Sequence, residues 1–224
     1  SLNGIDINDE QQLRGMLAIA FILKSNPELY QIYNNYTTTI EKLAGQEDNV
    51  SIRDLIKYIG NTTNLNELIS EDNLENIRTS LASLNKERIK KVFGENFTIP
   101  ETKRTELYFL SSTYSISGEI FSKLVHVDGN QSKRPFPKGL DLPAVFRNPS
   151  AQKILLKEYK ETQKWNEYGA ELNALQTQFD QFEGWDDSYS TLGLKTALSA
   201  TAEQDEYPGF MKTDAYNRKE LSTM

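Results

Sequence analysis

The sequence predicts an all-α fold, a compact multi-helix domain with one irregular, extended central segment. Several segments carry apolar residues at steps of three and four and begin with residues that cap helices. Only one segment has the aromatic and β-branched content of a strand. With 224 residues, 38% apolar and 25% charged, the chain can bury a core without disulfides or metals.

Two long helices are expected at the start of the chain. Residues 8–24 become apolar on all sides, which is typical of a buried helix. The longest apolar run, Met16 to Leu23, is far shorter than the about 20 residues that span a bilayer. Asn26 and Pro27 then supply an N-cap and a first helical residue. Apolar residues follow at helical spacing as far as Leu43, and Gly45 is the expected stop.

Two shorter helices follow in the predicted order. Ser51 and Asp54 form a capping-box pattern that opens a helix ending at Gly60. Ser70 precedes a second helix. The apolar face expected for it comprises Leu74, Ile77, Leu81 and Leu84.

The centre of the chain is less regular. Residues 105–117 favour an extended path, and residues 119–125 favour one or two helical turns. A loop over residues 128–138 contains Pro135 and Pro137, and loops of this length are often functional.

The second half contains the longest apolar pattern. Asn148 and Pro149 again predict a helix start. A heptad seam then predicts one continuous buried helix, with Trp165, Tyr168, Leu172, Leu175, Phe179 and Phe182 in the core. Further helices are expected over residues 189–201 and from 214 onward. No repeat or linker appears, so residues 1–224 are interpreted as a single helical domain, a fragment of a longer protein.

Charge and composition exclude several classes of function. The net charge of −7 argues against nucleic acid as the main partner. The absence of cysteine excludes thiolate nucleophiles and cysteine-ligated metals, and the single histidine, His126, excludes a multi-histidine site. We therefore expect no cofactor and no metal, and we interpret His126 as structural or exposed.

Carboxylates and aromatic side chains carry the remaining chemistry. Two carboxylates about 5–9 Å apart in an aromatic cleft would suit glycoside hydrolysis, and clustered oxygens would suit calcium. Helix capping and solubility are the favoured roles. The candidate catalytic residues are Asp141, Glu119, Asp186 and Asp187. The candidate binding residues are Pro137, Gly139, Asp141, Trp185, Tyr207 and Phe210. Asp141 precedes an apolar run, so its carboxylate is expected to cap a short helix; catalysis is the alternative.

The stretch from Arg134 to Phe146 (Arg-Pro-Phe-Pro-Lys-Gly-Leu-Asp-Leu-Pro-Ala-Val-Phe) is similar to a bacterial family named domain of unknown function 3160. That family carries a short helix ending near Leu-Val and then a Pro-x-Gly-Leu-Asp loop. A second resemblance covers Tyr207 to Thr213 and continues to Ala215, but Tyr216 stands where the family has Trp.

The resemblance implies a predominantly helical bacterial protein that is secreted or lipid-anchored at the cell surface, and hence an extracytoplasmic location. We expect a non-catalytic binding or scaffold module whose partner is a surface polysaccharide or a protein. The alternatives are a carboxylate-dependent glycan-active enzyme and a structural part of a longer domain without activity of its own. Facing carboxylates over an aromatic floor would favour the enzyme; scattered acids and buried aromatics would favour the module.

Overall fold

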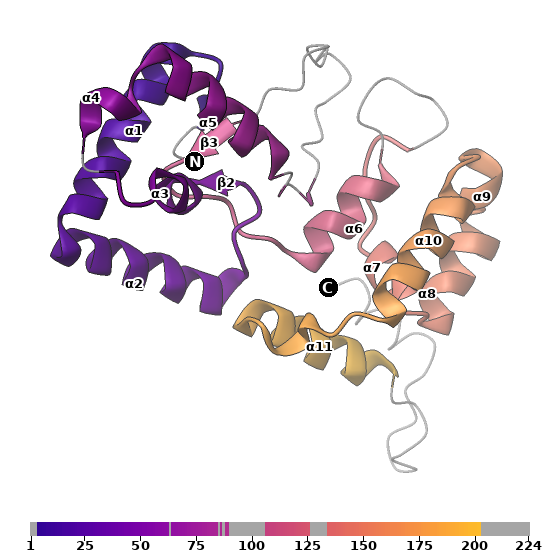
Figure 1. Cartoon of the computed structure of the whole chain (residues 1–224). Coiled ribbons are helices and arrows are strands. Elements are labelled where there is room, and N and C mark those ends of the chain that lie inside the picture. Colours follow the sequence, from indigo (N-terminus) through magenta and orange to yellow (C-terminus); the bar gives the residue numbers. More distant parts are fainter. Residues whose placement is uncertain are drawn as a thin grey trace. The chain divides into compact units, whose positions relative to one another are not determined.

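The computed structural model confirms a mostly helical fold (Figure 1). It describes residues 4–62, 64–84, 86, 88–89, 106–125 and 134–202. The chain divides into two compact units: unit 1 is residues 1–88 and 100–114, and unit 2 is residues 89–99 and 115–224. The interpretation of residues 1–224 as a single domain stays a prediction. In the described part of the chain, no helix is both long and apolar enough to cross a membrane.

Unit 1 begins with the two long helices that the sequence predicts. Helix α1 spans Glu10–Ser25, and Asp9 accepts a hydrogen bond from the main-chain N–H of Gln12 at its start. Helix α2 spans Pro27–Ala44, where the Asn26 side chain accepts from the main-chain N–H of Leu29 at 3.2 Å. Gly45 ends α2 with a φ of 125°, a conformation that favours glycine. Both helices therefore form where local capping chemistry places them.

The other helices of unit 1 follow the predicted order with two differences. Helix α3 spans Ile52–Ile59 and begins with the expected capping box, in which the Ser51 N–H donates to Asp54. The short helix α4, Leu65–Leu68, had no counterpart in the sequence prediction. Helix α5 spans Glu71–Ser83, so Leu84 lies at its end and is partly exposed rather than on the buried face.

A small sheet joins distant segments of unit 1. Strands β1 (Ile5–Asp6), β2 (Val50–Ser51) and β3 (Glu106–Tyr108) pair in the order β1-β3-β2. Strand β3 runs antiparallel to β1 and parallel to β2. Of the extended segment predicted over residues 105–117, only Glu106–Tyr108 forms a strand. The described residues after it are mainly irregular until Ile116 begins helix α6.

Unit 2 consists of short helices around an apolar core. Helices α6, α7 and α10 pack against one another. The elements of unit 2 are α6 (Ile116–Leu124), α7 (Asp141–Val145), α8 (Pro149–Lys153), a π-helical turn (Ile154–Glu158), α9 (Glu161–Lys164), α10 (Tyr168–Asp180), a 3₁₀ turn (Gly184–Asp186) and α11 (Tyr189–Ala202). The Asn148 side chain caps α8 as expected, accepting from the N–H of Ala151 at 3.0 Å.

The predicted continuous helix through the heptad seam is wrong at both ends. Trp165 has an extended backbone after α9, and its side chain is only half-buried. Helix α10 spans only Tyr168–Asp180, so Trp165 lies before it and Phe182, which is half-buried, lies after it. Its middle is confirmed as core, because Leu172, Leu175 and Phe179 are buried. The predictions for His126 and for residues 214 onward lie outside the described residues.

Candidate functional site

The candidate residue Asp141 begins α7 in unit 2. The loop before it starts at Arg134, whose backbone forms an isolated bridge with Val125. Pro135 and Pro137 restrict the backbone between these points. The Asp141 N–H donates to the carbonyl of Lys138 at 2.9 Å and so closes the turn that leads into α7. The loop is therefore held at both ends by local backbone structure.

The carboxylate of Asp141 is completely buried, with 0% exposure. It accepts hydrogen bonds from Arg134 Nη2, from the main-chain N–H of Lys138 at 2.8 Å and from the hydroxyl of Tyr168 at 3.0 Å. The capping prediction for Asp141 is wrong, since Leu140 occupies the N-cap position and the carboxylate makes no capping bond. Leaving a buried guanidinium unpaired costs more free energy than leaving a five-residue helix without a cap, so Asp141 pairs with Arg134.

A second buried carboxylate, Glu161, completes this cluster. It accepts from Arg134 Nη1 at 3.2 Å and from Lys138 Nζ at 2.6 Å. Glu161 is the first residue of α9, and Lys160 before it adopts a left-handed backbone (φ 54°). We call Arg134, Lys138, Asp141, Glu161 and Tyr168 the Arg134 cluster. Sequence reasoning identified only Asp141 of this cluster as a site residue. Arg134 opens the proline-rich stretch, whereas Glu161 carries no local signal.

Charges in the Arg134 cluster balance, with two cations against two carboxylates. Burial alone would lower the pKa of Arg134, but its hydrogen bond to Asp141 and the nearby negative charges raise it above its ordinary value. Burial raises the pKa of Tyr168, and the Asp141 charge raises it further. The guanidinium also lies 4.8 Å from the centre of the Tyr168 ring. At neutral pH Arg134 therefore stays charged and Tyr168 stays neutral.

The outer side of the same loop is apolar and exposed. Phe136, between two prolines, has 77% of its surface exposed. Tyr159 is partly exposed, and the Nζ of Lys138 lies 4.3 Å from the centre of its ring. Lys138 thus connects the buried cluster to an exposed aromatic side chain. The arrangement holds aromatic surface out to solvent on a braced loop.

The other candidate carboxylates lie in separate settings. Glu119 is buried in α6, where it accepts from Lys123 Nζ at 2.7 Å and from Gln178 Nε2 at 2.8 Å. Asp186 and Asp187 are exposed near the 3₁₀ turn. Among the described residues, no group of three or more acidic or histidine side chains is able to hold a metal.

The candidate aromatic residues also lie apart from the Arg134 cluster or outside the described residues. Trp185 is half-buried, and its ring centre lies 5.2 Å from those of both Phe146 and Phe182. It therefore belongs to an aromatic cluster of unit 2. Tyr207 and Phe210 lie outside the described residues. Pro137 and Gly139 lie in the loop that the Arg134 cluster supports.

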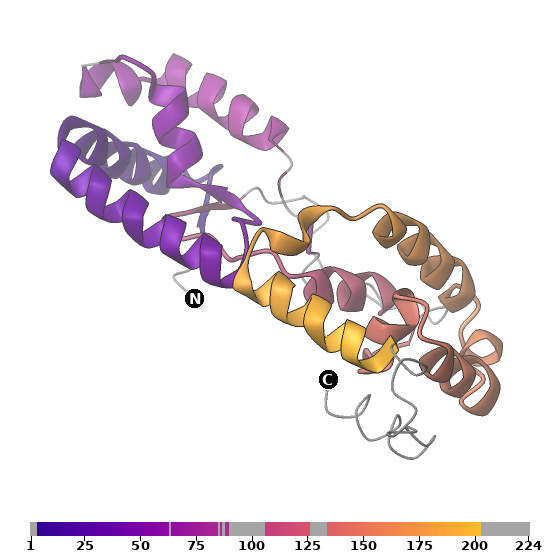
Figure 2. The same cartoon turned by 90° about the horizontal axis from the view of Figure 1, so that it is seen from below.

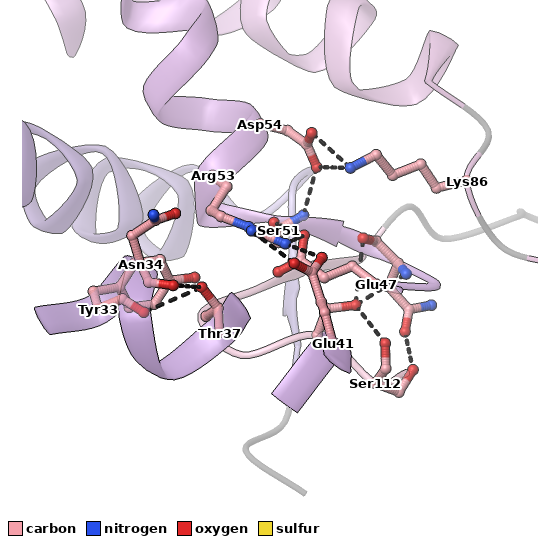
Figure 3. Close-up of polar contacts among 12 residues, drawn as sticks. Tyr33, Asn34, Thr37, Glu41, Glu47, Ser51, Arg53, Asp54, Lys86 and Ser112 are labelled. Atoms are coloured by element: carbon pink, nitrogen blue, oxygen red, sulfur yellow. Dashed lines mark hydrogen bonds and ion pairs between the residues drawn. The ribbon is translucent and has the colours of Figure 1, made fainter. Parts of the chain in front are cut away.

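Unit 1 holds a comparable ionic network that the sequence did not reveal (Figure 3). Arg53 on α3 binds Glu41 on α2 and also Glu47, at 3.3 Å. The hydroxyl of Ser51 donates to Glu47 at 2.7 Å. Asp54 pairs with Lys86. These contacts link α2 to α3, so we interpret them as structural.

Comparison with known proteins gives one match. Residues 3–224 match the family described as Protein of unknown function (DUF3160), which covers essentially the whole chain and agrees with the resemblance of its two short motifs. Neither the curated proteins nor the solved structures give a match.

Proposed function

The chain belongs to the family described as Protein of unknown function (DUF3160), and on that premise we propose that it is a non-catalytic binding or scaffold module. Its contact surface is the outer side of the loop from Arg134 to Asp141. The partner is a polysaccharide or a protein of the bacterial surface. This extracytoplasmic setting rests on the family resemblance.

One observation carries the proposal: the ion pair between Arg134 and Asp141 closes the loop while Phe136 stays 77% exposed. The exposed ring keeps apolar surface in contact with water, so covering it with a partner would be favourable. Held on a proline-restricted loop, it loses little entropy on binding, so its contacts convert efficiently into affinity. Aromatic rings also stack on sugars and act as anchors at protein interfaces.

The state of the acids supports binding over catalysis. Asp141 and Glu161 are buried in ion pairs with Arg134. A general acid or base must come within hydrogen-bond reach of a substrate, which these two carboxylates would do only after the cluster opened. Asp186 and Asp187 are exposed next to a half-buried Trp185 rather than along an aromatic floor.

The test is retention on bacterial cell-wall material. Purified protein is mixed with insoluble peptidoglycan and, separately, run through gels that contain soluble surface polysaccharide. Phe136→Ala and Tyr159→Ala should each weaken retention at least tenfold, the size typical of an interface anchor. Tyr58→Ala, which changes a similarly exposed tyrosine in unit 1, is the matched control and should bind normally.

Two results would contradict the proposal. Retention that is equal in the Phe136 variant and the control would remove the loop as the contact surface. Release of reducing sugars from the same polysaccharides by the unchanged protein would instead support a glycan-active enzyme.

A further inference from the structure

Helix α2 of unit 1 carries an apolar face that unit 1 does not bury. Only Tyr33 and Thr37 of α2 are buried. A stripe of larger apolar residues lies beside them and remains open to solvent. Its exposed members are Leu29 (43%), Ile32 (66%), Tyr36 (53%) and Leu43 (52%), and Ile40 is partly exposed. Figures 1 and 2 both show α2 on the rim of unit 1, with its outer side free of the other helices of that unit.

The orientation of this stripe is fixed by polar contacts on the side of α2 that packs against the rest of unit 1. The Tyr33 hydroxyl donates to the carbonyl of Phe109 at 2.7 Å. Glu41 is bound by Arg53 of α3, as Figure 3 shows. Rolling α2 to bury the stripe would break both contacts. The stripe is therefore presented outward by the fold of unit 1.

The stripe has a palindromic arrangement. Counted from Tyr36, its members stand at −7, −4, 0, +4 and +7, and the residues read Leu-Ile-Tyr-Ile-Leu. At 100° per residue all five lie within about 40° of the direction of Tyr36. A two-fold axis at Tyr36 therefore places Leu29 opposite Leu43 and Ile32 opposite Ile40 of an antiparallel copy. Self-complementarity of this kind is what a two-fold interface requires.

The charges beside the stripe fit the same arrangement. Glu28 and Lys42 are exposed on the same flank of α2, the flank that faces away from Tyr33. A two-fold axis brings identical flanks together, and it places Glu28 of one copy within about 3 Å, along the helix axis, of Lys42 of the other. Each dimer would contain this opposite-charge pair twice, in the manner of flanking charges in coiled coils. A parallel pairing would bring opposite flanks together and would leave Glu28 and Lys42 about 21 Å apart along the helix axis, so this pair would not form.

We propose that α2 pairs with α2 of a second copy of this chain, antiparallel and about a two-fold axis through Tyr36. The contact is independent of the binding loop in unit 2. A helix of 18 residues is about 27 Å long. One pair of such helices gives an interface at the small end of specific contacts, so we expect a reversible dimer with a dissociation constant in the micromolar range.

The first test is sedimentation equilibrium of the full chain from about 1 to about 200 µM, which spans that range. The unchanged protein should pass from monomer to dimer. Ile32→Glu should weaken association at least tenfold, because it places a charge inside the contact. Leu84→Glu, at a partly exposed leucine of the same unit, is the control and should dimerise normally.

A charge exchange tests the orientation. Glu28→Lys alone and Lys42→Glu alone should each weaken the dimer, since each brings like charges together. The double variant with both changes restores opposite charges across the two-fold axis and should recover association. No recovery would exclude the antiparallel register.

Disulfide trapping tests the position of the axis, because the chain has no cysteine of its own. Tyr36→Cys should cross-link to itself under oxidation. Leu29→Cys should not, because the two copies of position 29 would lie about 21 Å apart, whereas a disulfide needs Cα atoms within about 7 Å. A mixture of Leu29→Cys and Leu43→Cys proteins should form the mixed dimer.

Three results would overturn the proposal. Equal self-cross-linking at positions 29 and 36 would indicate a parallel or non-specific contact. A monomer at about 200 µM, far above a micromolar dissociation constant, whose melting temperature falls on Ile32→Glu would mean that the stripe is covered within the chain. A monomer whose melting temperature is unchanged by Ile32→Glu would mean that the stripe binds a different protein or has no partner.

Discussion

Each unit holds an arginine between two carboxylates, and the two arrangements differ in burial. In unit 1 the side chains of Arg53, Glu41 and Glu47 are 17%, 24% and 9% exposed. In unit 2 the side chains of Arg134, Asp141 and Glu161 are 3%, 0% and 1% exposed. Water can replace a lost partner in the first network, but it cannot do so readily in the second.

The comparison shows why only the buried arrangement constrains a loop. A desolvated ion is tolerated only in the geometry that pairs it, so opening the Arg134 cluster leaves a charge without water or partner. Arg53 remains paired with Glu47 when Glu41 is lost, and solvent screens the remainder. Unit 2 thus uses burial to hold an exposed aromatic loop, whereas unit 1 uses a wetter network to position a helix.

The largest effect is expected from Asp141→Asn, which keeps the shape of the side chain and removes its charge. Arg134 would lose its closest partner inside the protein, at a cost of about 3–5 kcal/mol of unfolding free energy. Both tryptophans of the chain, Trp165 and Trp185, belong to unit 2, so their fluorescence during urea denaturation reports this loss. A cost below about 1 kcal/mol would place the cluster with ordinary surface ion pairs.

Alkaline titration should show buried tyrosines in both units. Burial raises the pKa of Tyr33 and of Tyr168, and nearby carboxylates raise each further. A raised folded-state pKa means that stability is fully present below about pH 10, the unfolded value, and is lost as the pH rises beyond it. Absorbance titration should therefore find tyrosines that ionise only on unfolding, with one fewer in Tyr33→Phe and in Tyr168→Phe. Unchanged titration in both variants would argue against their burial.

A smaller effect is expected from Glu41→Gln in unit 1. Arg53 keeps Glu47 and partial access to water, so the loss should be about 1 kcal/mol or less. Circular dichroism during urea denaturation measures it, while the fluorescence transition of unit 2 should stay in place. A loss as large as that of Asp141→Asn would remove the distinction between the two networks.

The smallest effect on stability is expected from Phe136→Ala, which should stay within about 0.5 kcal/mol of the unchanged protein because the ring is exposed. The fluorescence transition again provides the measurement. A clear loss would mean that Phe136 packs in the fold and is not presented for binding.

The helix starts were predictable because their causes are local. The side chains of Asn26 and Asn148 each accept from an N–H group three residues further on, and the Ser51 N–H donates to the side chain of Asp54, also three residues further on. The buried face of α10 was predictable from its spacing for the same reason, since Leu172, Leu175 and Phe179 share one side of a single helix. The general family resemblance was likewise readable from two short motifs.

The partners of Asp141 were decided by tertiary structure. Judged from its neighbours in sequence alone, Asp141 precedes an apolar run and should cap a helix. In the fold, Tyr168 donates to Asp141 and Glu161 pairs with Arg134, and both come from parts of the chain that follow much later. The break at Trp165 was likewise not predicted, since the three-and-four spacing of the seam continues through it although its backbone is extended. Capping and helical spacing act over a few residues and are legible in sequence, whereas pairing of buried charges depends on which distant segments exclude water together.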